Sequence, residues 1–117
     1  MKNEKELETY SELKDEFFVR SNMLQKLEEK NVSGSEDNNE FNEFKRYILK
    51  DIFLCEIKII KIYKKISKIK ELKFQIILHE KYFLNKTWEE IAMFHNLSTS
   101  QMYRIRKKAL EAYEEIA

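Results

Sequence analysis

The stretch TWEEIAMFHNLSTSQMYRIRKKALEAY, residues 87–113, decides the fold, because it contains two helix-start signatures. Thr87 with Glu90, and Ser98 with Gln101, each match a capping box. In this arrangement a hydroxyl accepts a hydrogen bond from a backbone N–H group, and the longer side chain reaches back to the cap residue. The two boxes predict helices that begin at about residues 88 and 99.

The residues between the two boxes leave room only for a short first helix. We expect it to end by His95, because Asn96 is, after glycine, the type of residue that best adopts the left-handed conformation found where helices stop. A short helix, a tight turn and a longer helix are the elements of a helix-turn-helix motif. The sequence therefore predicts this motif at residues 87–113.

The second predicted helix has an apolar face and an opposite face that is polar and basic. Hydroxyls at a helix N-terminus suit phosphate groups, an arginine can bond a guanine edge with two N–H groups, and further cations can hold the DNA backbone. Arg104 is the candidate for the guanine edge. The candidates for phosphate contact are Ser98, Arg106, Lys107 and Lys108. The side chains expected to pack in the core are Ile91, Ala92, Leu97, Met102, Ile105, Ala109 and Leu110.

Two long amphipathic helices are predicted ahead of this motif, over residues 4–30 and 41–66, since apolar side chains recur three or four residues apart in both. The stretch IKIIKIY at 57–63 also alternates as a strand would, but no nearby residue could turn a hairpin, so a helix is favoured. A further helix over about 68–84 is expected to bury Ile69, Leu72, Ile76, Ile77 and Phe83.

A polar segment separates the two long helices. Residues 31–39, NVSGSEDNN, hold the only glycine of the chain, which is typical of a flexible linker. The predicted organisation is an acidic N-terminal helix at 1–30, a flexible linker at 31–40 and a helical DNA-binding domain at 41–117. Tyr10, Phe17 and Leu24 recur every seven residues, so the first helix could form the coiled-coil seam of a homodimer or pack on its own domain, and both remain open.

The composition favours an all-α protein. The 117 residues suit a single core, they include no proline and one glycine, and 43% are hydrophobic, which together predict long helices. The net charge of +1 conceals an asymmetry, because residues 1–40 hold six basic and eleven acidic side chains and the remainder hold sixteen and ten. Such a division is typical of proteins in which one part contacts nucleic acid.

Several classes of site are not expected. Cys55 is the only cysteine, so no internal disulfide can form, and with His79 and His95 it lacks the paired spacing of a zinc site. No nucleophile motif or glycine-rich phosphate loop occurs, so we expect neither catalysis nor a cofactor nor a metal ion. No segment approaches the roughly 18 consecutive apolar residues of a membrane helix, and the chain begins without a signal-like segment, so a cytoplasmic protein without membrane contact is expected.

Residues 82–113, YFLNKTWEEIAMFHNLSTSQMYRIRKKALEAY, resemble region 4 of sigma-70-type sigma factors. Both have a Thr-x-Glu-Glu-Ile-Ala segment, a loop with Leu-Ser and a helix that ends Lys-Ala-Leu. The matching positions are Tyr82, Leu84, Thr87, Glu89, Glu90, Ile91, Ala92, Leu97, Ser98, Ile105, Lys108, Ala109 and Leu110.

In its length and in the helices before the motif, the chain is most similar to small phage-encoded transcriptional regulators of the ArpU/RinA type. The resemblance implies double-stranded DNA as the partner and transcription regulation as the function. RNA polymerase is a further partner that it suggests. Residues 1–66 are too few for a promoter-melting region, so a complete sigma factor is not expected. The resemblance implies that the base-reading residues are Thr99, Ser100, Tyr103 and Arg104.

Two other functions remain open. The motif could be a protein-interaction module that binds RNA polymerase or another protein in place of DNA. A phage small terminase subunit also combines a helix-turn-helix with long helices, although such proteins usually place the DNA-binding unit first.

Overall fold

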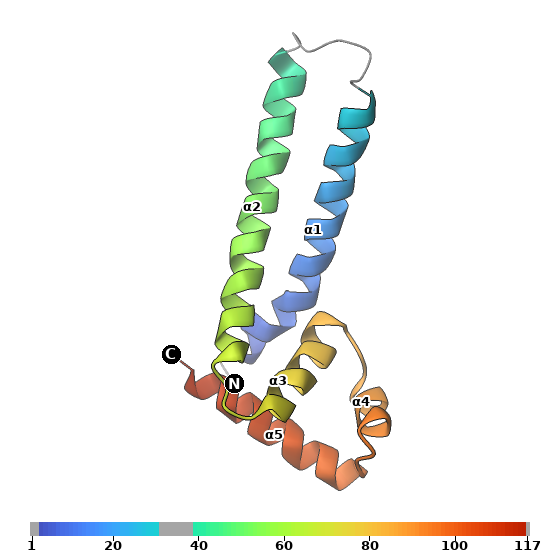
Figure 1. Cartoon of the computed structure of the whole chain (residues 1–117), viewed down its shortest axis with the longest axis vertical. Coiled ribbons are helices and arrows are strands. Elements are labelled where there is room, and N and C mark those ends of the chain that lie inside the picture. Colours follow the sequence, from blue (N-terminus) through green and yellow to red (C-terminus); the bar gives the residue numbers. More distant parts are fainter. Residues whose placement is uncertain (1–2, 31–38, 117) are drawn as a thin grey trace. The chain divides into compact units, whose positions relative to one another are not determined.

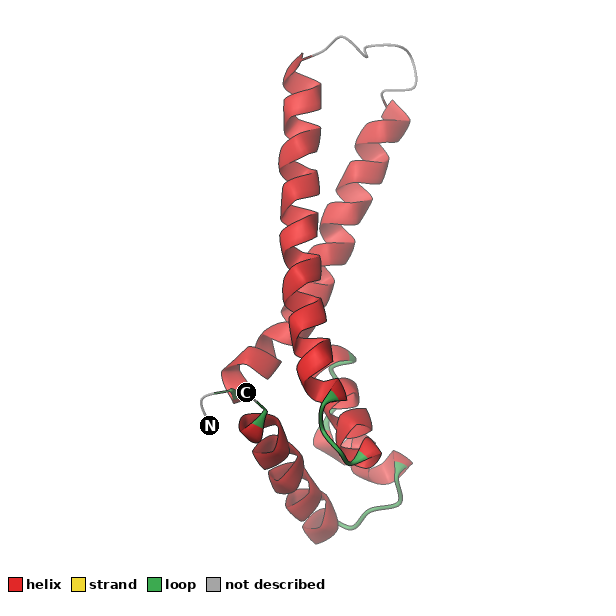
Figure 2. Ribbon diagram, turned by 60° about the vertical axis from the view of Figure 1, so that its left-hand side comes forward, coloured by secondary structure: helices red, strands yellow, loops and turns green. Residues whose placement is uncertain are grey.

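The computed structural model describes residues 3–30 and 39–116, and the elements among them are helical (Figure 1). They are α1 (Glu4–Lys30), α2 (Asn39–Ser67), α3 (Leu72–Leu78), a π-helical turn η2 (His79–Phe83), α4 (Trp88–Phe94) and α5 (Thr99–Glu115). The all-α prediction is confirmed, and the strand-like stretch at 57–63 is helical (Figure 2). Within the described ranges, no helix has the length and apolar character needed to cross a membrane.

The described residues form two compact units. One combines residues 3–12 with residues 60–116, and the other contains residues 13–30 and 39–59. The first turns of α1 therefore belong to the same unit as α3, α4 and α5. Most of the predicted linker at 31–40 lies outside the described residues, and its last two residues, Asn39 and Glu40, begin α2.

The unit of residues 13–59 pairs α1 with α2 in antiparallel directions (Figure 1). Arg20 on α1 contacts Asp51 on α2, with Nη1 and Oδ2 3.0 Å apart, and Lys45 Nζ lies 3.0 Å from Glu28 Oε1. These ion pairs link the two helices, and partly exposed pairs of this kind each contribute at most about 1 kcal/mol. The buried side chains of this unit are Leu13, Ile48 and Cys55, and burial raises the pKa of the Cys55 thiol.

In the unit of residues 3–12 and 60–116, the start of α1 is held by buried apolar and polar contacts. Leu7 is 0% exposed and Tyr10 is nearly as buried, so this end of α1 packs within its own unit. Glu6 Oε1 lies 2.9 Å from Lys65 Nζ and also accepts a hydrogen bond from the hydroxyl of Tyr113. Burial raises the pKa of Glu6, but the hydrogen bonds from Tyr113 and Lys65 outweigh it, so the net pKa is lowered.

The helix predicted over 68–84 is divided into two elements. The chain leaves α2 at Ser67, makes a turn and starts α3 at Leu72. Gln75 Nε2 donates to the carbonyl oxygen of Ile69 at 2.6 Å and so satisfies a backbone acceptor in the turn. After α3, η2 closes with a hydrogen bond from Leu84 N to His79 O, and Asn85 follows with a φ of 60°.

The predicted buried face of this segment is partly wrong. Ile69 and Ile77 are buried and Phe83 is half-buried, but Leu72 and Ile76 are exposed. The prediction assumed one continuous helix from residue 68. Because Ile69 lies in the turn, it cannot share a helical face with Leu72 and Ile76. The buried face of α3 is formed by Ile77 and Leu78.

Candidate functional site

The helices α4 and α5 begin at the two predicted caps. Glu90 N donates to Thr87 Oγ1 at 3.1 Å, and Thr87 N donates to Glu90 Oε1 at 3.2 Å. Gln101 N donates to Ser98 Oγ at 3.1 Å, and Ser98 N donates to Gln101 Oε1 at 2.9 Å. Both capping boxes are confirmed, and α4 ends before Asn96, whose φ of 55° is the left-handed conformation predicted for it.

The pair α4 and α5 rests on a small apolar core. Ile77, Ile91 and Met102 are buried together and bring α3, α4 and α5 into contact. Ala109 and Leu110 are also buried, which confirms the predicted apolar face of α5. The partly buried residues packed around the three central side chains are Trp88, Ala92, Leu97 and Ile105.

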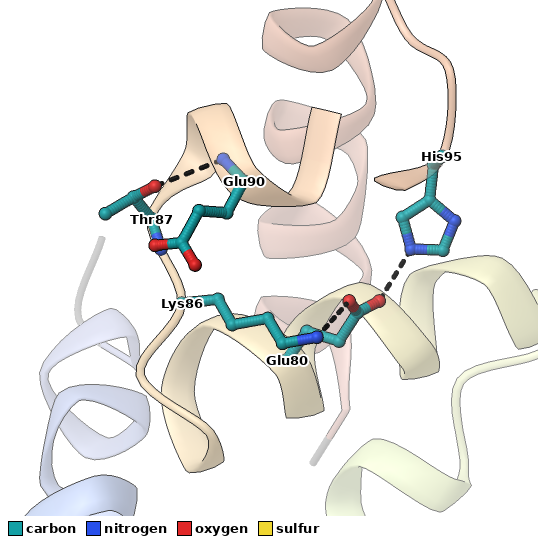
Figure 3. Close-up of polar contacts among 5 residues, drawn as sticks. All are labelled: Glu80, Lys86, Thr87, Glu90 and His95. Carbon is teal, nitrogen blue, oxygen red and sulfur yellow. Dashed lines mark hydrogen bonds and ion pairs between the residues drawn. The ribbon is translucent and has the colours of Figure 1, made fainter. Parts of the chain in front are cut away.

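Both ends of α4 are tied to one buried carboxylate, that of Glu80 on η2 (Figure 3). Glu80 is only 7% exposed, its Oε1 lies 2.6 Å from His95 Nε2 after α4, and its Oε2 lies 3.4 Å from Lys86 Nζ before α4. Neither Glu80 nor its contact with His95 was predicted from the sequence. Glu80 lies in η2 and His95 follows α4 fifteen residues later, so the periodicity of a single helix gives no signal for their contact.

The outward face of α5 carries most of the predicted contact residues. Tyr103 and Arg104 are exposed, and Arg104 has Lys107 and Lys108 on the turn that follows. Ser98 Oγ, besides its capping role, lies 3.3 Å from Ser100 Oγ. The exposed members of the predicted set are Ser98, Thr99, Ser100, Tyr103, Arg104, Lys107 and Lys108.

Arg106 differs from the other predicted phosphate contacts because it is half-buried. Its guanidinium carbon lies 4.9 Å from the centroid of the Trp88 ring, and Lys81 Nζ lies 5.4 Å from the same centroid. Arg106, Lys81 and Trp88 also line a hollow with two acidic side chains of α1, Glu4 and Glu8. The structure therefore places Arg106 beside α4 and acidic groups, at the edge of the outward face.

Lys73 was missed by the sequence analysis. It is exposed in the first turn of α3, and it lines a surface hollow together with Arg104 and Lys108 of α5. Lys73 lies outside residues 87–113, the stretch in which the sequence predicted DNA-contacting residues. Lys73 lies beside Arg104 and Lys108 only because α3 packs against α5.

Some cations of the described chain form ion pairs with carboxylates, and those of α5 form none. Lys65 pairs with Glu6, Lys86 with Glu80 and Arg20 with Asp51. Within residues 3–30 and 39–116, Arg104, Lys107 and Lys108 have no carboxylate within 4.0 Å. The same ranges hold no group of three or more His, Cys, Asp or Glu side chains that could bind a metal ion.

Comparison of the chain with protein-family models, curated proteins and solved structures finds no match.

Proposed function

We propose that this protein binds duplex DNA sequence-specifically, with α4 and α5 as a helix-turn-helix and α5 in the major groove, and that it regulates transcription in a phage or prophage. The regulatory role rests on the resemblance to sigma region 4. The DNA-binding role is supported by α5, whose capped N-terminus and exposed face offer hydroxyls and cations to a groove.

The observation that carries the proposal is the set of cations without acidic partners on α5. Exposed Lys and Arg side chains that only solubilise a surface are commonly interspersed with acids, as they are along α1. On α5, Arg104, Lys107 and Lys108 stand together, and the acidic residues follow only from Glu111. A local excess of positive charge beside a helix N-terminus attracts a polyanion.

The residues divide into two roles in this proposal. Thr99, Ser100 and Tyr103 face the base edges, because they lie in the first turns of the recognition helix. Lys107 and Lys108 contact backbone phosphates. Arg104 stands between the two groups, one turn after Ser100.

The test is a charge reversal, R104E/K107E, in the full chain. We expect this variant to lose binding to duplexes selected from a random library by the wild-type protein, as measured by fluorescence anisotropy. Its melting temperature should be nearly unchanged, since exposed substitutions usually cost less than about 0.5 kcal/mol each. A folded variant that keeps wild-type affinity would refute the docking of α5, and wild-type affinity that does not fall with salt would refute a phosphate-driven contact.

A second candidate function is a protein-interaction module, which one observation favours. Met93 and Phe94 on α4 are 80% and 72% exposed, and adjacent exposed apolar side chains are typical of protein contacts. RNA polymerase is the partner that the sigma resemblance suggests. Co-purification with polymerase that survives R104E/K107E but is lost in M93S/F94S would assign this contact to α4. A protein that binds polymerase and no duplex at low salt would favour this function over DNA binding.

A further inference from the structure

Three cationic side chains from two helices line one surface hollow. Lys73 comes from α3, and Arg104 and Lys108 come from successive turns of α5. Leu97 and Ile105 supply its apolar part, and Gln101 its remaining polar group. The hollow is thus formed by tertiary packing and is not a property of α5 alone.

No acid compensates this positive charge. Among the residues that the structure describes, Lys73, Arg104 and Lys108 form no ion pair, and no carboxylate lines the hollow. Neighbouring positive charges repel one another, and a bound anion offsets the free energy of this repulsion. Lys65 and Lys86 in the same unit each have a glutamate partner, whereas the three cations of the hollow have none among the described residues.

The polar groups of the hollow are suited to donate hydrogen bonds. Lysine and arginine side chains have donors and no acceptors. Gln101 already uses Oε1 to accept from Ser98 N, which leaves its amide NH₂ to donate. Donors without acceptors fit an oxyanion, and a mixture of lysine and arginine is common at phosphate sites.

We propose that Lys73, Arg104 and Lys108 hold one backbone phosphate of duplex DNA. This inference rests on the proposed function and deepens it, because it adds α3 to the DNA-contacting surface. It also assigns Arg104 to the backbone instead of a guanine edge. The ligand is a phosphate of DNA and not a free anion, because the hollow adjoins the exposed face of α5 through Arg104.

The first test compares Lys73→Gln with wild type on a selected duplex and on an unrelated duplex of equal length. We expect the variant to bind both duplexes about tenfold more weakly, because it loses one charge-assisted hydrogen bond to the phosphate. Lys73→Arg should restore most of the affinity. Lys50→Gln, which removes an exposed lysine of α2, is the matched control and should bind as wild type does. Equal melting temperatures establish that the variants are folded.

The second test separates backbone from base contact at Arg104. Selection from a random library with Arg104→Gln should return the wild-type consensus at lower affinity. A lost preference at one base pair would overturn the assignment of Arg104 to phosphate. Lys73→Gln with wild-type affinity for both duplexes would overturn the site while the proposed function stands. A wild-type protein that binds no duplex would overturn both.

Inorganic phosphate is the probe for a free anion. If the site serves the DNA backbone, phosphate should compete with the duplex no better than potassium chloride of equal ionic strength. Stronger competition by phosphate that is lost in Lys73→Gln would assign the hollow to a free anion and overturn the DNA assignment.

Discussion

The guanidinium of Arg106 lies over the indole ring of Trp88, with its central carbon 4.9 Å from the ring centroid. This contact joins the middle of α5 to the first residue of α4. Arg106 is therefore a structural residue of the α4–α5 pair as well as a candidate phosphate contact, and its structural role can be tested by unfolding experiments.

Arg106→Gln should lower the free energy of unfolding by about 1 kcal/mol, because it removes a cation–π contact with a partly buried ring. Lys107→Gln is the matched control, since Lys107 is exposed and forms no pair among the described residues, and it should change stability by less than about 0.5 kcal/mol. Urea denaturation measures both. Equal stabilities of the two variants would show that the Arg106 contact contributes nothing to folding.

The double variant E4Q/E8Q should bind duplex DNA more tightly than wild type. Glu4 and Glu8 line a hollow with Arg106 and Lys81, so their negative charge opposes the approach of phosphates. We expect a gain of about two- to fivefold at low salt that disappears at high salt, because exposed charges interact weakly and are screened. Glu56→Gln on α2 is the control for net charge, and an equal gain in that variant would contradict a local effect.

Leu7→Ala should destabilise the unit of residues 3–12 and 60–116 by about 2–5 kcal/mol, the usual cost of deleting a fully buried leucine side chain. Phe18→Ala, which removes a side chain 58% exposed on the same helix, should cost far less. Thermal unfolding followed by circular dichroism compares them. If the predicted DNA-binding domain at 41–117 melts as the full chain does, the start of α1 is dispensable and this prediction is wrong.

Glu80→Ala should cost about 1–3 kcal/mol, since it leaves His95 and Lys86 without their shared carboxylate. The loss should also raise amide hydrogen exchange within α4, whose two ends the carboxylate ties down. Glu111→Ala, an exposed acid on α5, is the control. Unchanged exchange in α4 would mean that the apolar core alone positions this helix.

Stability should fall as the pH drops below about 6.5, in part through His79. Burial lowers the pKa of His79 below its ordinary value of 6.5, so the unfolded chain binds a proton at this residue more readily than the folded chain does. The contribution of neutral His79 to the free energy of unfolding is therefore fully present above pH 6.5, and it is lost as the pH falls through the lowered pKa of the folded state. Tyr10 and Tyr63 surround the ring, and burial also raises the pKa of Tyr10 to about 12.

The check is the pH dependence of unfolding in wild type and in His79→Gln. The difference between the two should shrink from pH 7 to pH 5, because only the wild type has a group at this position that gains a proton. Glu6 titrates below this range, since its pKa is lowered from 4.5. A difference that stays constant would show that His79 does not contribute to the pH dependence.

Local signals in the sequence were sufficient to predict α4 and α5. Thr87, Ser98 and Asn96 act through hydrogen bonds or backbone angles within a few residues, so the helix boundaries follow from the residues themselves. The predicted core at Ile91 and Met102 is also confirmed, because helical periodicity is a local property.

The features that sequence could not supply depend on tertiary packing. Glu80 of η2 meets His95 beyond the end of α4, and Lys73 lies beside Arg104 and Lys108 only because α3 packs on α5. Leu72 and Ile76 are exposed because a turn precedes α3, and this turn contains no glycine or proline that would have predicted it. The spacing of residues within one helix does not predict which residues of other helices it will contact.

The backbone amide of Asn3 donates to Glu114 Oε2 at 3.0 Å, across 111 residues of sequence, and the Glu6–Tyr113 hydrogen bond spans nearly as many. During synthesis, Leu7 and Tyr10 therefore emerge from the ribosome long before the C-terminal part of their core exists. The antiparallel pairing of α1 and α2 needs only residues up to 59 and can form on the nascent chain. The start of α1 must wait for α5, because its contacts with Tyr113 and Glu114 can form only after translation has passed these residues.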